Sequence, residues 1–146
     1  MDRITPEDRS RLMSRVRSAD TTPEMVVRRR LHAAGLRYRL HRRDLPGRPD
    51  LVLPRFKIAV FVHGCFWHGH LGCDRGRRRP KTRAEFWDRK LRENRDRDAR
   101  VAAELQAMGW TVATVWECET KRPADLERAL GPILRAGGKD GCQEVR

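Results

Sequence analysis

The sequence has no long apolar run and few aromatic residues. No stretch approaches the roughly 20 apolar residues of a membrane span, and the N-terminus has no apolar signal segment. There are four cysteines and one tyrosine, and aromatic side chains make up only 6% of the 146 residues. These absences argue against a membrane enzyme and against a secreted disulfide scaffold. We expect a cytoplasmic, nucleoid-associated protein with no membrane partner.

Acidic residues are too few to balance the basic ones. The 33 Lys and Arg residues outnumber the 20 Asp and Glu residues, which gives a net charge of +13, and most of the bases are arginines. The guanidinium group of arginine binds phosphate through two parallel hydrogen bonds and also stacks on bases, so nucleic acid is the expected partner. Apolar residues still make up 38% of the chain, which is enough for one folded domain.

Capping signals and apolar periodicity predict four helices and four strands. The expected helices cover 5–18, 23–34, 83–108 and 123–135. The expected strands cover 36–40, 51–53, 56–62 and 110–116, with the middle two forming a hairpin. This order predicts a mixed α/β fold in which helices flank a mixed central sheet. We assign 1–136 to a single domain, with 137–146 as a polar, mobile tail.

The segment 63–73 concentrates three imidazoles and two thiols. Cys65, His70 and Cys73 are spaced for a loop around a tetrahedral zinc ion, which needs a fourth ligand from elsewhere. Cys118, just after the last expected strand, is a better candidate than the cysteine in the Gly-rich tail. The alternative is a set of free cysteines with solvated histidines, but reduced cysteine is rare in so polar a loop. We expect a structural zinc ion, because the loop has few apolar side chains to hold it.

An aspartate and two histidines suit hydrolysis of a phosphodiester. Asp50 opens one strand of the expected hairpin, and His63 and His68 flank the end of the other strand. Hydrolysis needs a carboxylate to hold Mg²⁺ and a base of near-neutral pKa to take the proton of water. Asp50 suits the first role and His68 the second. The alternatives are an ordinary strand-edge aspartate and solvated loop histidines.

The segment after the histidines is basic and contains aromatic residues nearby. We assign phosphate contacts to its six basic residues, which are Arg75, Arg77, Arg78, Arg79, Lys81 and Arg83. Phe66 and Trp67, which stand among glycine and histidine, are interpreted as a wedge that stacks on bases. Core packing is the alternative for these rings and for Trp87. Glu24, taken alone, is a capping acid in the first turn of its helix.

Four motifs in this order resemble the very short patch repair (Vsr) DNA mismatch endonucleases. They are LPGRPD at 45–50, VHGCFWH at 62–68, EFW at 85–87 and VWEC at 115–118. The resemblance covers roughly residues 8–120 and implies a restriction-endonuclease-like fold with a zinc site. It also implies an enzyme that nicks one strand 5′ to the T of a T·G mismatch left by deamination of 5-methylcytosine. A MutL-type mismatch-repair protein is a further implied partner, and a chain of this size is expected to act as a monomer on DNA.

The resemblance assigns roles position by position. It makes Asp50 the Mg²⁺-binding aspartate, with the backbone carbonyl of Val62 as the other protein ligand. His68 matches the histidine that activates water, and His63 and Glu24 match auxiliary active-site residues. The matched zinc ligands are Cys65, His70, Cys73 and Cys118. The matched intercalating side chains are Phe66, Trp67 and Trp87, with Met13 of the N-terminal helix reaching the minor groove.

The sequence departs from the family's pattern at two positions. Val62 stands where threonine is usual, and one extra residue precedes Cys73 in the zinc loop. The second strand of the hairpin also lacks the acid-x-lysine pattern of ordinary restriction nucleases, so a histidine must replace that lysine. Two other functions stay open: a restriction or homing-type nuclease that cuts undamaged or modified duplex, and a zinc-stabilised DNA-binding module without catalysis.

Overall fold

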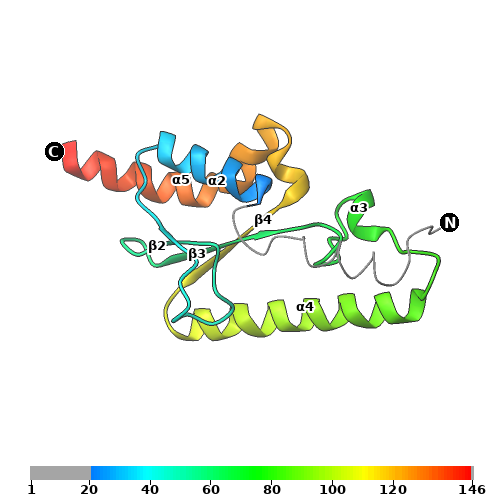
Figure 1. The fold of residues 1–146 in the computed structure, drawn as a ribbon. Helices are drawn as coiled ribbons and strands as arrows, with labels where there is room; N and C mark the ends of the chain where they lie inside the picture. The colour runs from blue at the N-terminus through cyan, green and yellow to red at the C-terminus, as the bar shows by residue number, and fades with distance from the viewer. Residues whose placement is uncertain (1–20, 146) are drawn as a thin grey trace.

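A four-stranded sheet lies between two layers of helices in the computed structural model, which describes residues 21–145 and the side chains up to Gly137 (Figure 1). The strands are β1 (Arg39–Leu40), β2 (Leu51–Leu53), β3 (Ile58–His63) and β4 (Thr111–Trp116), in that order across the sheet. The first three are antiparallel and β4 runs parallel to β3. The mixed sheet and the expected hairpin are therefore confirmed. The expected helix at 5–18, which contains Met13, lies outside the described residues.

Helices cover both faces of the sheet. They are α2 (Thr22–Ala33), α3 (Asp74–Arg77), α4 (Ala84–Ala107), the short 3-10 helix η1 (Glu117–Thr120) and α5 (Pro123–Val145). Figure 1 shows α2 and α5 together on one face and α4 along the other. Among the described residues, no helix is both long enough and apolar enough to cross a lipid bilayer.

The alternation of β3 assigns its side chains to the two layers. Ile58 and Val60 pack in the core under α2 and α5, whereas Ala59 and Phe61 pack in the core on the α4 side. His63 continues the second series, and its ring lies against that of Phe61 with a centroid separation of 5.7 Å. The period of the strand thus directs His63 toward α4, where β3 ends.

Two elements differ from the sequence prediction. The expected strand 36–40 is reduced to two exposed residues, because Leu36 packs in the core beside α2 and α5 instead of pairing in the sheet. The last helix was expected to end at Arg135, but α5 continues to Val145. Gly137 permits α5 to pass close to Leu36, since a Cβ at residue 137 would lie 2.3 Å from Leu36 Cδ2. Residues 137–145, predicted as a tail, are therefore helical.

Candidate active site

A cleft of about 880 Å³ opens at the carboxyl end of β3. It brings together the predicted residues Asp50, His63 and His68, and Trp67 lies in its wall. The residues of this cleft that the sequence analysis missed include His41, Arg97 and Asp98. The cleft thus joins residues from the turn before β2, the end of β3 and α4. The sequence predicted that the residues before β2 and at the end of β3 would meet.

Asp50 lies directly before β2 and faces the end of β3. The backbone N–H of Val62 donates to its Oδ2 at 2.7 Å. Burial raises the pKa of the Asp50 carboxyl to about 6; the Val62 hydrogen bond opposes this shift, and the nearby charge of Glu24 adds to it. A carboxylate that is costly to ionise on its own suits a position beside a cation.

His68 forms a short hydrogen bond with an acid of α4. Its Nδ1 lies 2.6 Å from Asp98 Oδ2. The pKa of Asp98 is lowered: burial alone would raise it, but the hydrogen bond with His68 and the charges of His68, His63 and Arg97 outweigh that effect. An ionised carboxylate only accepts hydrogen bonds, so Nδ1 of His68 carries the proton and donates. This leaves Nε2 of His68 as the ring nitrogen that can accept a proton.

His63 lies flat against His68. The two rings stack with centroids 3.7 Å apart and planes 3° apart. Burial lowers the pKa of His63 to about 4, and the neighbouring His68 lowers it further. His63 Nδ1 is 4.0 Å from Asp98 Oδ2, which is beyond hydrogen-bond distance. His63 is therefore neutral at physiological pH and supports the ring of His68 without competing for Asp98.

Two polar residues of α4 hold this loop in place. Asn94, only 7% exposed, donates from Nδ2 to the Trp67 carbonyl at 2.8 Å, and Asp98 binds His68 one turn later. Both lie on the inward face of the helix, between the fully buried Leu91 and Leu105. The signal was present in the sequence, because a polar pair at apolar positions of a helical pattern indicates a partner on the facing element.

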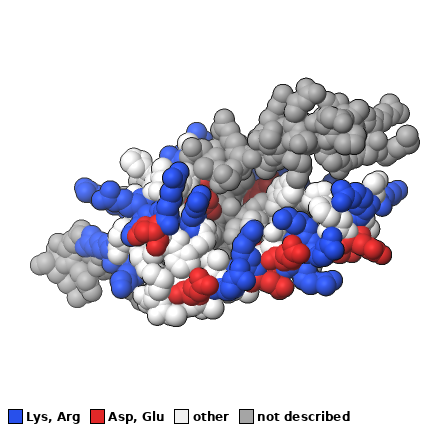
Figure 2. Space-filling model, turned by 60° about the horizontal axis from the view of Figure 1, so that its bottom comes forward, with Lys and Arg blue, Asp and Glu red and all other residues white. Residues whose placement is uncertain are grey.

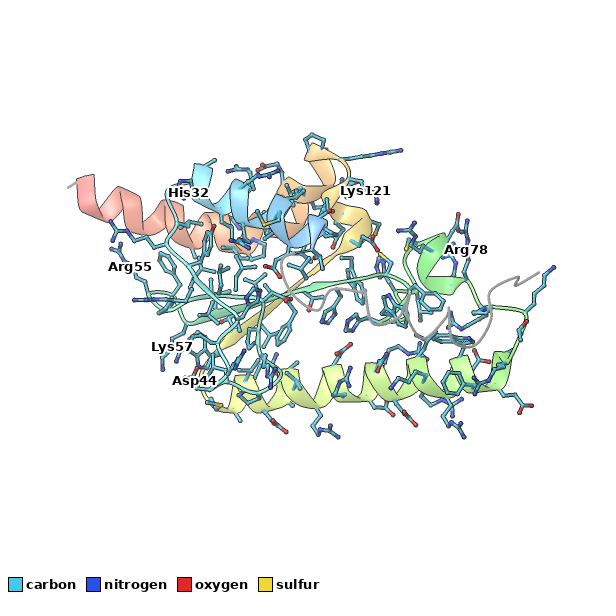
Figure 3. All side chains as sticks on the ribbon, in the orientation of Figure 1. His32, Asp44, Arg55, Lys57, Arg78 and Lys121 are labelled. Carbon is cyan, nitrogen blue, oxygen red and sulfur yellow. The ribbon has the colours of Figure 1, made fainter. Side chains whose placement is uncertain are left out.

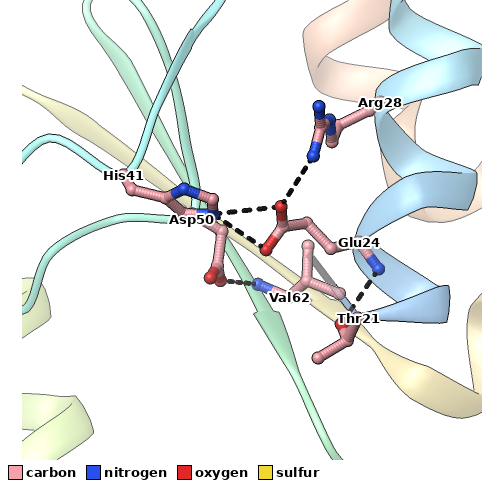
Figure 4. Close-up of polar contacts among 6 residues, drawn as sticks. All are labelled: Thr21, Glu24, Arg28, His41, Asp50 and Val62. Carbon is pink, nitrogen blue, oxygen red and sulfur yellow. Dashed lines mark hydrogen bonds and ion pairs between the residues drawn. The ribbon is translucent and has the colours of Figure 1, made fainter. Parts of the chain in front are cut away.

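Glu24 is buried, which a simple capping acid is not. Its backbone N–H is capped by Thr21 Oγ1 at 3.3 Å, and its carboxylate accepts from Arg28 Nη1 at 3.3 Å (Figure 4). Nε2 of His41 lies 3.1 and 3.0 Å from its two oxygens. The donor atoms of Glu24, His41 and Asp50 all lie within 4.8 Å of one another. The helix start is thus connected to the edge of the sheet where Asp50 lies.

The four predicted zinc ligands converge at one point. One donor atom from each of Cys65, His70, Cys73 and Cys118 lies within 4.8 Å of the others. His70 Nδ1 is 3.6 Å from Cys118 Sγ, and the His70 ring stacks on Trp116 at 4.1 Å. Sulfur and nitrogen donors at zinc bond lengths are separated by just under 4 Å in a tetrahedral site. This donor set therefore suits zinc. It consists of two thiols and an imidazole from the loop and a third thiol, that of Cys118, from η1 just after β4.

The chemistry of the thiols also suits a cation. Burial raises the pKa of the Cys65 thiol to about 12, so a nearby positive charge is needed to hold it as a thiolate. Helix α3 packs closely over this cluster, and its Gly76 N–H donates to Cys73 Sγ at 3.4 Å. A Cβ at Gly76 would lie 1.8 Å from the His70 carbonyl oxygen. The loop therefore closes tightly around the four donors, and its extra residue does not prevent convergence.

The predicted intercalating side chains form one cluster. The rings of Phe66, Trp67 and Trp87 meet edge to face with centroid separations of 5.3, 5.6 and 5.9 Å. All three are only partly buried. Phe66 and Trp67 lie between Cys65 and His68 along the chain, so contacts of these two residues restrain the segment at both ends. The aromatic cluster thus lies beside the cleft, with Phe66 and Trp67 on a restrained loop and Trp87 on α4.

The six predicted phosphate contacts differ in their surroundings. Three arginines are paired within the protein: Arg75 with Glu117, Arg77 with Asp74 and Arg79 with Asp88. Arg83 lies over the ring of Phe86 at 4.2 Å. Arg78 and Lys81 are exposed, and Figure 3 places Arg78 beside α3. Figure 2, which views the molecule from the α4 side, shows acidic and basic side chains intermixed instead of a continuous basic face.

Comparisons with known proteins identify the family of this chain. The sequence matches the family described as DNA mismatch endonuclease Vsr over residues 1–75. The type II nicking enzyme V.XorIIP of Xanthomonas oryzae pv. oryzae is 53% identical over 133 residues, which is 91% of this chain and 96% of that protein. V.NmeAIP of Neisseria meningitidis serogroup A is 40% identical over 92% of this chain and 94% of its own length. The DNA mismatch endonuclease Vsr of Escherichia coli K12 is 42% identical over 75% of this chain and 69% of its own length.

Together the cleft and these relatives define an endonuclease that acts on DNA. The chain belongs to the Vsr family of DNA mismatch endonucleases. The expected resemblance and the expected enzyme class are both confirmed.

Proposed function

We propose that this endonuclease nicks one strand of duplex DNA 5′ to the T of a T·G mismatch left by 5-methylcytosine deamination, which starts very short patch repair. The observation that carries the proposal is one cleft that combines Asp50, the His68–Asp98 pair and the ring of Trp67. A mismatched pair unstacks at lower cost than a matched one. An aromatic wedge beside the hydrolytic residues therefore selects the lesion where cleavage occurs.

His68 is the proposed general base. Its Nδ1–H is bound to Asp98, so its Nε2 takes the proton of the attacking water, and Asp98 stabilises the imidazolium that forms. Stacking on His63 fixes the plane of the ring. His63 stays neutral because burial and the neighbouring His68 depress its pKa to about 4. Glu24 completes the site as an auxiliary carboxylate at the edge of the sheet.

Asp50 is the proposed Mg²⁺ ligand, together with the Val62 carbonyl. The N–H of Val62 points at Asp50, and the N–H and C=O of one strand residue face the same neighbouring strand. Valine in place of threonine is compatible with this arrangement, because only the backbone of residue 62 takes part. When bound, Mg²⁺ supplies positive charge that stabilises the phosphate oxygens as negative charge develops on them.

Zinc is the proposed structural ion, held by Cys65, His70, Cys73 and Cys118. It would hold the aromatic segment and α3 against the end of β4. We further propose that the sheet belongs to the restriction-endonuclease-like class, in which a histidine takes the place of the usual lysine. Monomeric action on DNA and recruitment of a MutL-type protein are parts of the same proposal.

Strand cleavage of end-labelled duplexes tests the proposal. Duplexes with T·G or C·G at one position, in a panel of flanking sequences, are incubated with Mg²⁺ and wild-type, Asp50→Ala or His68→Ala protein. The proposal predicts a nick 5′ to the T in T·G duplexes alone, which both variants lose. Zinc content is measured on the same preparations to show that the variants retain the metal.

The other two functions give different results in this assay. A restriction or homing-type nuclease would cut T·G and C·G duplexes equally, and Phe66→Ala would leave its activity largely intact. A DNA-binding module would bind tightly without cleavage in a zinc-loaded preparation, and Asp50→Ala would not change that binding. Either pattern would contradict mismatch-specific nicking.

A further inference from the structure

His41 enters the active site from an unusual backbone position. Its φ is +48°, in the left-handed region that few residues other than glycine adopt, asparagine, aspartate and histidine being the most frequent of them. It follows β1 directly, and its backbone N–H donates to the Asp50 carbonyl at 3.1 Å. Such a conformation persists only where the surrounding contacts determine it, and it is enriched at functional sites. The turn out of β1 therefore serves to point this side chain inward.

The side chain of His41 connects two layers of the fold. Its Nε2 lies 3.0 and 3.1 Å from the two oxygens of Glu24, which is only 1% exposed (Figure 4). Arg28 also contacts Glu24, but it lies on the same helix and moves with it. His41 comes from the sheet edge, so its contact sets where the Glu24 carboxylate lies relative to Asp50.

The three side chains are close enough to influence each other strongly. The donor atoms of Glu24, His41 and Asp50 lie within 4.8 Å of one another. Two ionised carboxylates at this separation repel each other, and the contact of His41 Nε2 with both oxygens of Glu24 opposes that repulsion. His41 lines the cleft that contains Asp50 and His68. Its position beside both acids therefore bears directly on the geometry at the proposed metal ligand.

We propose that His41 is a positioning residue of the nuclease site, which holds the Glu24 carboxylate in place beside Asp50. The inference rests on the proposed function, because that function gives Glu24 and Asp50 their roles. His41 itself acts only through Glu24. Its loss therefore lowers the rate of strand cleavage and leaves DNA binding nearly unchanged.

The pair His41→Gln and His41→Asn separates the side chain from the backbone. The amide nitrogen of glutamine reaches the position of Nε2 and keeps the donor, whereas asparagine is too short but tolerates positive φ well. Lys57→Asn is the matched control, since Lys57 also has positive φ, +53°, but lies at the opposite end of β3 outside the cleft. His41→Ala and the double variant Glu24→Ala/His41→Ala complete the set.

The readouts are the single-turnover cleavage rate, the Kd for the duplex and the thermal unfolding midpoint. We expect His41→Asn and His41→Ala to lose on the order of 100-fold in rate, the scale of a misplaced catalytic group. The Kd should change by less than about threefold, a small free-energy difference. His41→Gln should recover most of the rate, and Lys57→Asn should match the wild type.

The double variant supplies the decisive comparison. If His41 acts through Glu24, the double variant is no slower than Glu24→Ala alone within about twofold. Additive losses, a fully active His41→Asn or a His41→Gln as slow as His41→Asn would each overturn the inference. If the alanine variants unfold, the asparagine and glutamine variants decide it alone. Rates are compared on whichever duplex the wild type cuts, so a failed preference for T·G contradicts the proposed function and not the role of His41.

Discussion

Asp98 gives direction to a histidine that would otherwise lie unrestrained in a polar loop. It binds Nδ1 of His68 from a neighbouring helix and so fixes which ring nitrogen is free to accept a proton. The hydrogen bond and the adjacent positive charges keep the pKa of Asp98 low despite partial burial. The tautomer and the orientation of the His68 ring are thus determined by a residue distant in sequence.

Asp98→Asn should lower the cleavage rate by about 10²–10⁴, because the amide no longer enforces the tautomer that leaves Nε2 free. DNA binding and zinc content should stay close to those of the wild type. Single-turnover cleavage of preformed complexes measures the effect. Asp96→Asn, an exposed acid of the same helix, is the control. Equal rates for the two variants would show that the hydrogen bond to His68 has no role in catalysis.

Asp50 is expected to destabilise the fold at neutral pH when no Mg²⁺ is added. Burial raises its folded pKa to about 6 from an ordinary 3.8. The protonated form is therefore favoured in the folded state, and stability falls as pH rises between these two values. Asp50→Asn should add about 1–3 kcal/mol at pH 7.5 and less at pH 5. Urea unfolding at both pH values measures this difference.

The matched control for that measurement is Asp44→Asn. Asp44 is exposed and its pKa is lowered by a hydrogen bond from Arg42, so its replacement should give no gain at pH 7.5. If Asp50→Asn were no more stable than the wild type at pH 7.5, burial would not be straining this carboxylate. The same variant must lose cleavage activity for the proposed role of Asp50 to hold.

Local patterns predicted the residues whose neighbours are close in sequence. The spacing of Cys65, His70 and Cys73 indicated their convergence, and the position of Asp50 at a strand start placed it by the end of β3. Asp98 and His41 escaped prediction because each depends on contacts between separate elements. In a helix rich in acids and arginines, nothing local marks Asp98 as functional except its position among the apolar residues of the buried face.

At the scale of elements, α3 depends on one glycine. Gly76 lies against the backbone of His70, and a Cβ there would meet the carbonyl oxygen at 1.8 Å. Because the contacted atoms are backbone, they cannot move aside as a flexible side chain can. The short helix therefore packs over the thiol cluster only if residue 76 has no side chain.

Gly76→Ala should lower zinc content and the thermal unfolding midpoint, because α3 must lift away from His70. Gly131→Ala is the matched control. A Cβ at Gly131 would meet only the flexible end of Arg135, at 2.9 Å, and alanine favours the helix. Metal analysis of both purified proteins provides the measurement. Normal zinc loading in Gly76→Ala would contradict the proposed tight closure of the loop.

Element boundaries were harder to predict than element types. The hairpin and the long charged helix were correct, since apolar runs and periodicity define them directly. β1 is shorter than its alternating pattern suggests because Leu36 is used in the helical core. The two glycines near 137 signalled a helix end, yet Gly137 instead permits contact with Leu36. Tertiary packing determined the length of β1 and the end of α5. Capping signals and periodicity carry no information about such packing.

The chain carries a net charge of +13, yet the face seen in Figure 2 is not uniformly basic among the described residues. Acidic and basic side chains alternate over α4, and Arg75, Arg77 and Arg79 are already paired with acids (Figure 2). Most of the phosphate contact near the zinc loop should therefore come from the exposed Arg78 and Lys81. The net charge alone overstates the number of ionic contacts with DNA.

Arg78→Ala and Lys81→Ala should each weaken duplex binding and reduce the slope of log Kd against log salt by about one. Arg77→Ala should change the slope less, since its guanidinium is engaged by Asp74 and the Leu71 carbonyl. Binding titrations over a range of salt concentrations measure these slopes. A larger effect for Arg77→Ala than for Arg78→Ala would show that DNA displaces the internal ion pairs.

The stretch 78–83, most of which is exposed, separates residues along the chain that contact one another in the fold. His68 lies before it and Asp98 after it, and three of the four proposed zinc ligands precede it while Cys118 follows. Each of the two fragments produced by a cut at this stretch would carry one member of the His68–Asp98 pair and an incomplete set of the proposed zinc ligands. With zinc bound as proposed, we expect the metal to promote reassociation of the two fragments. The fold therefore suits division into two fragments that are inactive when separate. Nicking of DNA would then measure their reassembly.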